Sequence, residues 1–124
     1  NRQNGLLNTA HPIIKGRNLQ EQVNQLITYT GSSLSGEGYT NVLKLAPSAT
    51  QKKWNGTMPD GLGNSQCLAG SVGKGRVVAL GDCNGFTAMY VLNKAGEKLA
   101  AGMQVKTLDW KQFALNTFHW LSKH

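Results

Sequence analysis

The residues best suited to chemistry follow a run of apolar residues in the second half of the chain. Val77 to Leu80 lead directly into Gly81-Asp82-Cys83-Asn84-Gly85. The glycine spacing around Cys83 is that of a nucleophile elbow, where a strand turns sharply into a helix and small flanking residues relieve the strain. Cys83 is therefore a candidate thiol nucleophile.

A thiol nucleophile needs a base within hydrogen-bond reach, and the chain offers three histidines. His119 leans away from the inward stripe of the last predicted helix, and His124 is the terminal residue. His11 lies in the N-terminal segment and could approach the end of a strand, although no neighbouring carboxylate would orient its ring. Cys83 with His11 is thus the catalytic pair of one hypothesis, a cysteine-dependent amidase or hydrolase.

Asp82 is a stronger polar candidate than Cys83. A carboxylate just past a buried strand must be solvated, hydrogen-bonded or bound to a ligand. Two roles are open: Asp82 accepts backbone N–H bonds in the following turn, or it contacts a ligand or metal. Because ligands bind at the strand ends of open α/β sheets, we expect Asp82, Cys83 and Asn84 to line a ligand-binding crevice.

Motifs for a metal or a cofactor are absent from the sequence. Two cysteines cannot form a zinc site unaided, and the six acidic residues do not pair convincingly for hydrolysis. The Gly73-Lys74-Gly75 turn lacks the spacing of a phosphate-binding loop and precedes a strand rather than a helix. We therefore expect neither a bound metal nor a cofactor.

A third hypothesis rests on Trp54 beside Lys52 and Lys53 in a long irregular connection. An exposed indole next to two cations would suit a carbohydrate or polyanion binder. The chain carries 13 basic and 6 acidic residues, a net charge of +7. Its basic residues are otherwise scattered singly, whereas nucleic-acid-binding modules concentrate theirs on one face, so nucleic acid is not an expected partner.

The two cysteines, Cys67 and Cys83, permit one disulfide. A hairpin around the Gly73-Lys74-Gly75 turn would place Cys67 opposite Leu80 or Gly81. Cys83 then lies two or three residues beyond the register, which argues mildly against a bridge unless the strand bends. Both the paired and the free state stay open at this point.

The chain as a whole has the size and composition of one globular domain. It has 124 residues, of which 40% are hydrophobic and 15% charged. No apolar run approaches the ~20 residues of a membrane span. The first residues contain neither an initiator methionine nor a signal-peptide core, which suggests a processed chain or a part of a longer one.

Two helices are predicted, one early and one at the C-terminus. Asn18 is a good N-cap with Glu21 at the capping-box position, and the apolar spacing that follows predicts an amphipathic helix ending at Gly31. Asp109 and Gln112 form a second capping box. The predicted inward stripe of the terminal helix consists of Trp110, Phe113, Ala114, Thr117, Phe118 and Leu121.

Strands are predicted between these helices. Residues 39–45 have strand composition, and Lys44 indicates a position near an edge. Residues 66–71 and 76–81 would form the hairpin. The unbroken apolar run of residues 77–80 suits a strand covered on both faces. Residues 86–92 and 99–106, on either side of a turn, are compatible with strand or helix.

Three segments stand out along the chain. They are Ala10-His11-Pro12-Ile13-Ile14-Lys15-Gly16-Arg17 continued by residues 28–34, then Gln66-Cys67-Leu68-Ala69-Gly70 running into Gly73-Lys74-Gly75-Arg76-Val77-Val78-Ala79-Leu80-Gly81-Asp82, and finally residues 112–121. In this order they resemble the "HPI…GR", "GKGRVVVLGD" and "FALN…WL" motifs of bacterial class I glutamine amidotransferase-like domains, which have flavodoxin-like sheets.

All three motifs belong to the later half of such domains, so the resemblance implies that the opening strands, which carry the family's nucleophile elbow, are not in this chain. It aligns Cys83 with an ordinary strand-end position. Residues 1–124 are then a single domain or the C-terminal part of a larger one. The implied fold is α/β, a partial flavodoxin-like open sheet with a hairpin, an early amphipathic helix and a C-terminal helix.

The resemblance also bears on function. It favours a non-catalytic binding or assembly domain over an enzyme. An open sheet edge invites pairing, so the expected partner is a second copy or another chain that completes the sheet. Because many members of the family are secreted or periplasmic, that location is expected here.

Overall fold

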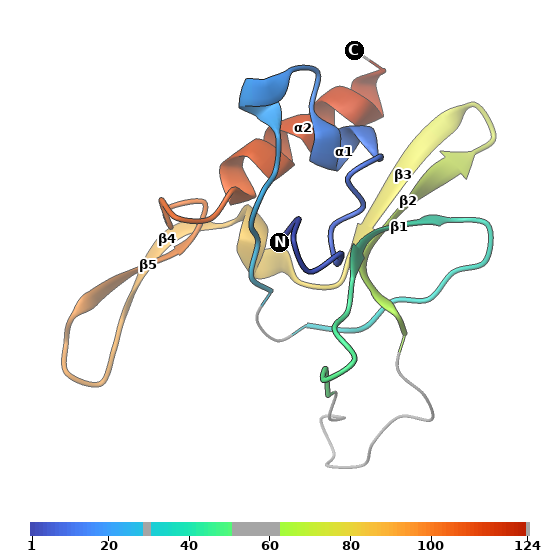
Figure 1. The fold of residues 1–124 in the computed structure, drawn as a ribbon. Helices are drawn as coiled ribbons and strands as arrows, with labels where there is room; N and C mark the ends of the chain where they lie inside the picture. Colours follow the sequence, from blue (N-terminus) through green and yellow to red (C-terminus); the bar gives the residue numbers. More distant parts are fainter. Residues whose placement is uncertain (29–30, 51–62, 124) are drawn as a thin grey trace.

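The computed structural model describes residues 1–28, 31–50 and 63–123. The fold is mixed α/β, as predicted, with two antiparallel sheets (Figure 1). Strands β1 (Thr40–Lys44), β2 (Ser65–Val72) and β3 (Gly75–Leu80) form one sheet, and β4 (Ala88–Leu92) and β5 (Lys98–Gly102) form the other. Two short 3₁₀ helices, η1 (Leu19–Glu21) and η2 (Cys83–Phe86), and the helices α1 (Pro12–Lys15) and α2 (Trp110–Ser122) complete the fold.

The predicted hairpin is confirmed, with the first of its two predicted registers. Cys67 pairs with Leu80, and the strands close at Val72 and Gly75. Gly73 adopts a φ of 57° in the turn, a left-handed conformation that glycine reaches without steric cost. β2 lies between β1 and β3, and its first five residues are all buried. The strand predicted over residues 39–45 is also confirmed, at the edge of the sheet that Lys44 indicated.

The expectation that residues 77–80 form a strand covered on both faces is wrong. β3 is the last strand of its sheet, and only β2 pairs with it in the described part of the chain. Val78 and Leu80 pack against the core, while Val77 on the opposite face is 37% exposed. The apolar run therefore belongs to a half-covered edge strand, and β2 is the central one.

The early helix is much shorter than its sequence pattern predicts. Asn18 does cap it, accepting hydrogen bonds from the N–H groups of Gln20 and Glu21, but only the single turn η1 forms. The Val23 N–H instead donates to the Ile14 carbonyl, and the Val23 carbonyl accepts from Arg2. Tertiary hydrogen bonds thus replace the helical ones, and Val23 enters the core as extended chain.

Helix α2 begins where predicted, but its capping box does not form. The Asp109 side chain makes no capping hydrogen bond within the helix. Its Oδ2 atom accepts from the N–H groups of Asn24 and Gln25, at 2.7 and 3.0 Å. Asp109 therefore ties the start of α2 to the extended segment that follows η1.

The inward stripe of α2 differs from the prediction at one aromatic residue. Trp110, Phe113, Ala114 and Thr117 are buried, but Phe118 is 65% exposed. Asn116 is buried in its place. Its amide donates to the carbonyls of Ile13 and Glu21, so a polar side chain holds α1 and η1 against α2.

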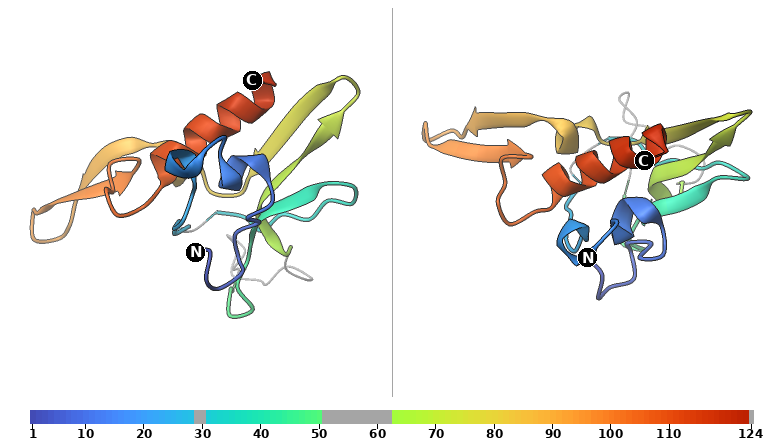
Figure 2. Two further views of the ribbon diagram at one scale, coloured as in Figure 1. Left: turned by 45° about the horizontal axis from the view of Figure 1, so that its top comes forward. Right: turned by 90° about the horizontal axis from the view of Figure 1, so that it is seen from above.

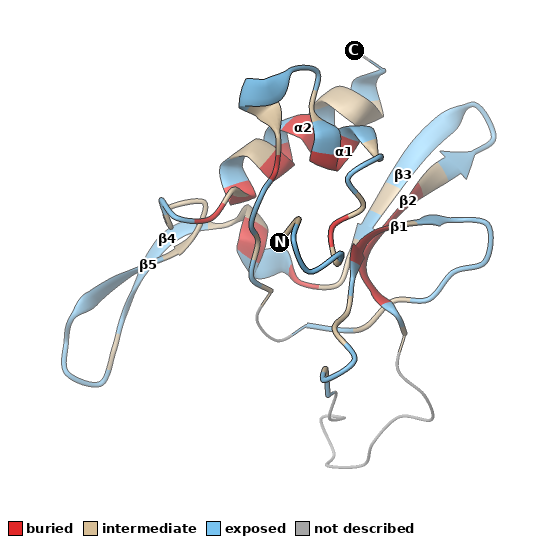
Figure 3. Ribbon diagram, viewed as in Figure 1, coloured by how far each residue is buried: buried red, intermediate tan, exposed pale blue. Residues whose placement is uncertain are grey.

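The core lies where α1, α2 and the three-stranded sheet face one another (Figure 3). Two hairpins project from this body on opposite sides, β2–β3 on one and β4–β5 on the other (Figure 2). Among the described residues, no helix has the length and apolar character needed to cross a membrane.

Candidate functional site

The strand-end turn after β3 is built around Asp82. This side chain is only 1% exposed, and its Oδ1 atom accepts a hydrogen bond from the Asn84 N–H at 2.9 Å. Asp82 is thereby the N-cap of η2. The predicted turn role is confirmed, and contact of Asp82 with a ligand stays a prediction.

Packing explains the glycine spacing that suggested a nucleophile elbow. A Cβ atom on Gly85 would lie 2.3 Å from the ring of Trp110, and one on Gly81 would lie 2.0 Å from the Ser32 carbonyl oxygen. The turn leads into the short η2 and then into β4, not into an α-helix. Both glycines therefore make room for neighbouring groups, without the strand–turn–helix geometry of an elbow.

His11 occupies a structural position at the start of α1. Its Nδ1 atom accepts from the Ile13 N–H, and its ring lies 5.2 Å from that of Trp120. Partial burial lowers the pKa of His11. Trp120 is about 15 Å along α2 from Trp110, the residue against which Gly85 of η2 packs. The structure thus places His11 and Cys83 near opposite ends of α2 and does not assemble the proposed pair.

The two cysteines are free thiols in different surroundings. Cys67 is fully buried in β2, whereas Cys83 is exposed in η2. Burial raises the pKa of Cys67 to about 12. At neutral pH this thiol is therefore protonated as well as inaccessible.

Iodoacetamide is expected to modify one cysteine of the native protein. The reagent reaches only accessible thiols, so at pH 8 the exposed Cys83 should react while the buried Cys67 stays intact. Intact-mass spectrometry should show one adduct under native conditions and two in denaturant. The Cys83→Ser variant is the control and should gain none while folded; a native adduct on Cys67 would contradict the burial of β2.

The remaining predicted site residues lie elsewhere. Trp54, Lys52 and Lys53 fall outside the described residues. Within the ranges that are described, no cluster of three or more histidine, cysteine or acidic side chains is arranged to hold a metal ion.

The most unusual surface of the molecule is the hairpin formed by β4 and β5, residues 88–102, here called the arm. It extends away from the body (Figures 1 and 2). Every residue of β4 is exposed. Five large apolar side chains of the arm are 43–73% exposed: Met89, Tyr90, Val91, Leu92 and Leu99.

One face of the arm is wholly apolar. Met89 pairs with Ala101, and Val91 pairs with Leu99, so these four side chains share a face. The opposite face is mixed, with the Lys98 ammonium 4.5 Å from the centre of the Tyr90 ring. The tip is a turn in which the Asn93 side chain accepts from the N–H groups two and four residues later.

The apolar face of the arm forms one wall of a groove, here called the arm groove. Its volume is about 390 Å³, and the body contributes Ile27, Leu108 and Trp110 to the opposite wall. Asn84, one of the predicted ligand-contact residues, lines the groove, whereas Asp82 and Cys83 do not. The groove is thus an apolar cleft between arm and body.

The sequence contains the turn and the flanking apolar residues of the arm, but it did not by itself decide between strands and helices there. The turn at residues 93–96 was predicted, and the flanking residues were compatible with strands. Placing Val91 opposite Leu99 across that turn would have shown that their apolar side chains share one face.

Comparisons of the chain with protein-family models, with curated proteins and with solved structures find no match.

Proposed function

We propose that this chain is a non-catalytic assembly domain whose arm binds the arm of a second copy. The observation that carries the proposal is the arm itself, an extended hairpin with one wholly apolar face that borders an apolar groove. The resemblance to the later half of amidotransferase-like domains supports the same proposal, because it aligns Cys83 with an ordinary strand-end position and not with the family's nucleophile.

Energetics favour a partner for the arm. An isolated two-stranded hairpin is marginally stable in water, and three or more strands or a packed face are usually required. Soluble monomers also rarely expose large contiguous apolar patches. Leu92, at 73% exposure, and Tyr90, at 52%, have almost no cover on the mixed face. Contact of the apolar face with another chain would give this hairpin the packed face that it lacks.

A second copy suits the arm because the surface is complementary to itself. In a twofold dimer the same patch meets itself, so Met89, Val91 and Leu99 of each arm would pack against those of the other. Each arm groove would receive apolar side chains from its partner. Each copy thus supplies both an apolar projection and a place to receive one.

The charge of the arm also permits two copies to approach there. The chain carries +7 overall, but residues 88–102 contain only Lys94, Glu97 and Lys98. The arm therefore carries a much smaller net charge than the whole chain, and electrostatic repulsion between two arms is correspondingly weak. The alternative partner, another chain that adds a strand to the outer edge of β3, is an outcome that the following experiment separates.

Sedimentation velocity at increasing protein concentration tests the proposal. The wild type is expected to move from monomer to dimer, and Leu99→Lys should weaken dimerisation at least tenfold, because it places an ammonium on the apolar face of the arm. Leu19→Lys is the matched control, since Leu19 is 77% exposed in η1 and should not affect assembly.

Two results would overturn this proposal. A wild type that stays monomeric at high concentration would leave no role for a second copy. Equal dimerisation of the wild type and Leu99→Lys would remove the arm from the interface and point to another surface, such as the β3 edge. Far-UV circular dichroism establishes that each variant is folded.

A further inference from the structure

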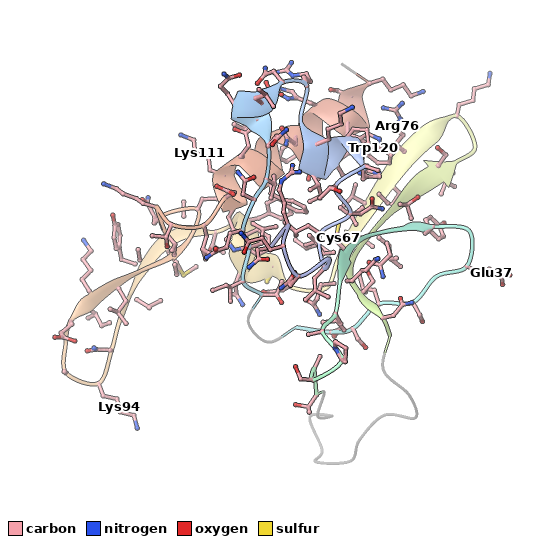
Figure 4. All side chains as sticks on the ribbon, viewed as in Figure 1. Glu37, Cys67, Arg76, Lys94, Lys111 and Trp120 are labelled. Atoms are coloured by element: carbon pink, nitrogen blue, oxygen red, sulfur yellow. The ribbon has the colours of Figure 1, made fainter. Side chains whose placement is uncertain are left out.

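A second feature lies away from the arm, where α1, β3 and the C-terminal end of α2 meet. A pocket of about 220 Å³ opens there between cationic side chains from three separate segments. Arg17 follows α1, Arg76 lies on β3, and Lys123 ends α2. Figure 4 shows Arg76 beside Trp120 at this junction, with Lys94 far away on the arm.

The cations of this pocket are only partly neutralised. Arg17 forms an ion pair with Glu21 at 2.6 Å, the one such pair within the described residues. Arg76 and Lys123 have no carboxylate partner in that part of the chain. Among the described residues, no acidic side chain lines the pocket. Arg76 and Lys123 thus line it without an ion-pair partner in that part of the chain.

The C-terminus of α2 accounts for some of this arrangement but not all. Arg76 donates one hydrogen bond to the Trp120 carbonyl, and Lys123 donates one to the Lys74 carbonyl. Cations are favourable at a helix C-terminus. A guanidinium has five N–H donors, however, and an ammonium has three, so donors of both side chains are available to a ligand.

The Arg76 guanidinium is held in place before any ligand binds. It lies 5.1 Å from the centre of the Trp120 ring, a cation–π distance, and its hydrogen bond to the same residue fixes its orientation. A planar guanidinium fixed in this way suits bidentate recognition of an oxyanion. Ordering it in advance lowers the entropic cost of binding.

The wall of the pocket also includes the His119 side chain, which has a buried nitrogen without a hydrogen-bond partner among the described residues. This nitrogen is the Nδ1 atom of the imidazole. Buried polar atoms without partners are rare in folded proteins. The residue that lines the pocket thus has one ring nitrogen that the described residues leave without a partner.

We propose that this pocket binds a small oxyanion, the phosphate or carboxylate group of a ligand, through Arg76 and Lys123. Its volume lies below the roughly 300–1,000 Å³ of pockets that enclose drug-sized molecules, so a compact anion fits it better than a large cofactor. This site is independent of the arm, and its existence does not depend on assembly.

Titration of ¹⁵N-labelled protein with sodium phosphate, at constant ionic strength, tests the proposal. Saturable shifts are expected at Gly16 and Lys123, and Arg76→Gln should weaken binding at least tenfold, as should Lys123→Gln. The matched control is Lys94→Gln, which removes one positive charge at the tip of the arm and should bind phosphate as the wild type does. A parallel titration with sodium acetate distinguishes phosphate from carboxylate recognition.

Three results would contradict the proposal that this pocket binds an oxyanion. Shifts that grow linearly without saturation for both anions would show that neither anion binds at a specific site. Equal weakening by Arg76→Gln and Lys94→Gln would show attraction by the net charge of the protein. Saturable shifts confined to residues away from Gly16 and Lys123 would place the anion elsewhere. The side chains of Arg76, Lys94 and Lys123 are exposed, so the amide spectrum of each variant should otherwise match that of the wild type.

Discussion

Replacing Phe113 with alanine is expected to destabilise the fold by about 3–5 kcal/mol, the cost of removing a buried aromatic ring. Phe113 is fully buried, and its ring lies 5.6 Å from that of Trp110 and 6.0 Å from that of Phe86. Small domains have only about 5–15 kcal/mol of stability in total. Urea unfolding followed by far-UV circular dichroism should therefore show a large drop in the midpoint.

Phe118 provides a matched control one and a half turns further along α2. It is 65% exposed, so Phe118→Ala should change the free energy of unfolding by no more than about 0.5 kcal/mol, as surface substitutions usually do. Similar losses for the two variants would mean that α2 presents a different face to the core.

Gly85→Ala is expected to destabilise the fold by about 3 kcal/mol, the upper end of the usual cost of overpacking. The added methyl group would lie 2.3 Å from the Trp110 ring, which is itself only 2% exposed and cannot move outward easily. The Trp110 Nε1 atom also donates to the Ile27 carbonyl, which restrains the ring further. Thermal unfolding of both proteins measures the difference.

Gly75→Ala separates this steric effect from the general effect of replacing glycine. A methyl group on Gly75 would meet nothing closer than the Val72 carbonyl oxygen at 3.5 Å. This variant should be neutral or gain up to about 1 kcal/mol, because alanine restricts the unfolded chain. A Gly85→Ala protein as stable as Gly75→Ala would contradict the packing of η2 on Trp110.

Local signals were sufficient to predict the β2–β3 hairpin. The turn glycines and the position of Cys67 opposite Leu80 or Gly81 follow from neighbouring residues, and the structure pairs Cys67 with Leu80. The start of α2 was predicted for the same reason. The buried face of α2 differs from the prediction because the Asn116 amide donates to two carbonyls, one in α1 and one in η1. A helical pattern does not reveal these acceptors.

The failures arose where distant residues compete with local preference. The segment after Asn18 has a helical pattern, but the backbone of Val23 bonds to Ile14 and Arg2 instead. Likewise, the glycines flanking Cys83 suggested chemistry, and their actual neighbours, Ser32 and Trp110, are far away in sequence. Periodicity alone cannot report such contacts.

The arm needed information that no single segment carries. Its strands and turn are readable, but the exposure of both its faces depends on what the rest of the chain leaves uncovered. Figure 3 shows the arm as almost entirely exposed, whereas the buried residues gather in the body. The proposal that a second copy covers it is therefore the central claim to test.

Isotope-filtered NOE spectroscopy on an equal mixture of ¹³C-labelled and unlabelled protein tests this claim most directly. We expect intermolecular contacts from the methyl groups of Val91 and Leu99 to the Met89 and Leu108 side chains of the other copy. Intermolecular contacts that involve only β3, or none at a concentration where the protein is dimeric, would contradict assembly through the arm.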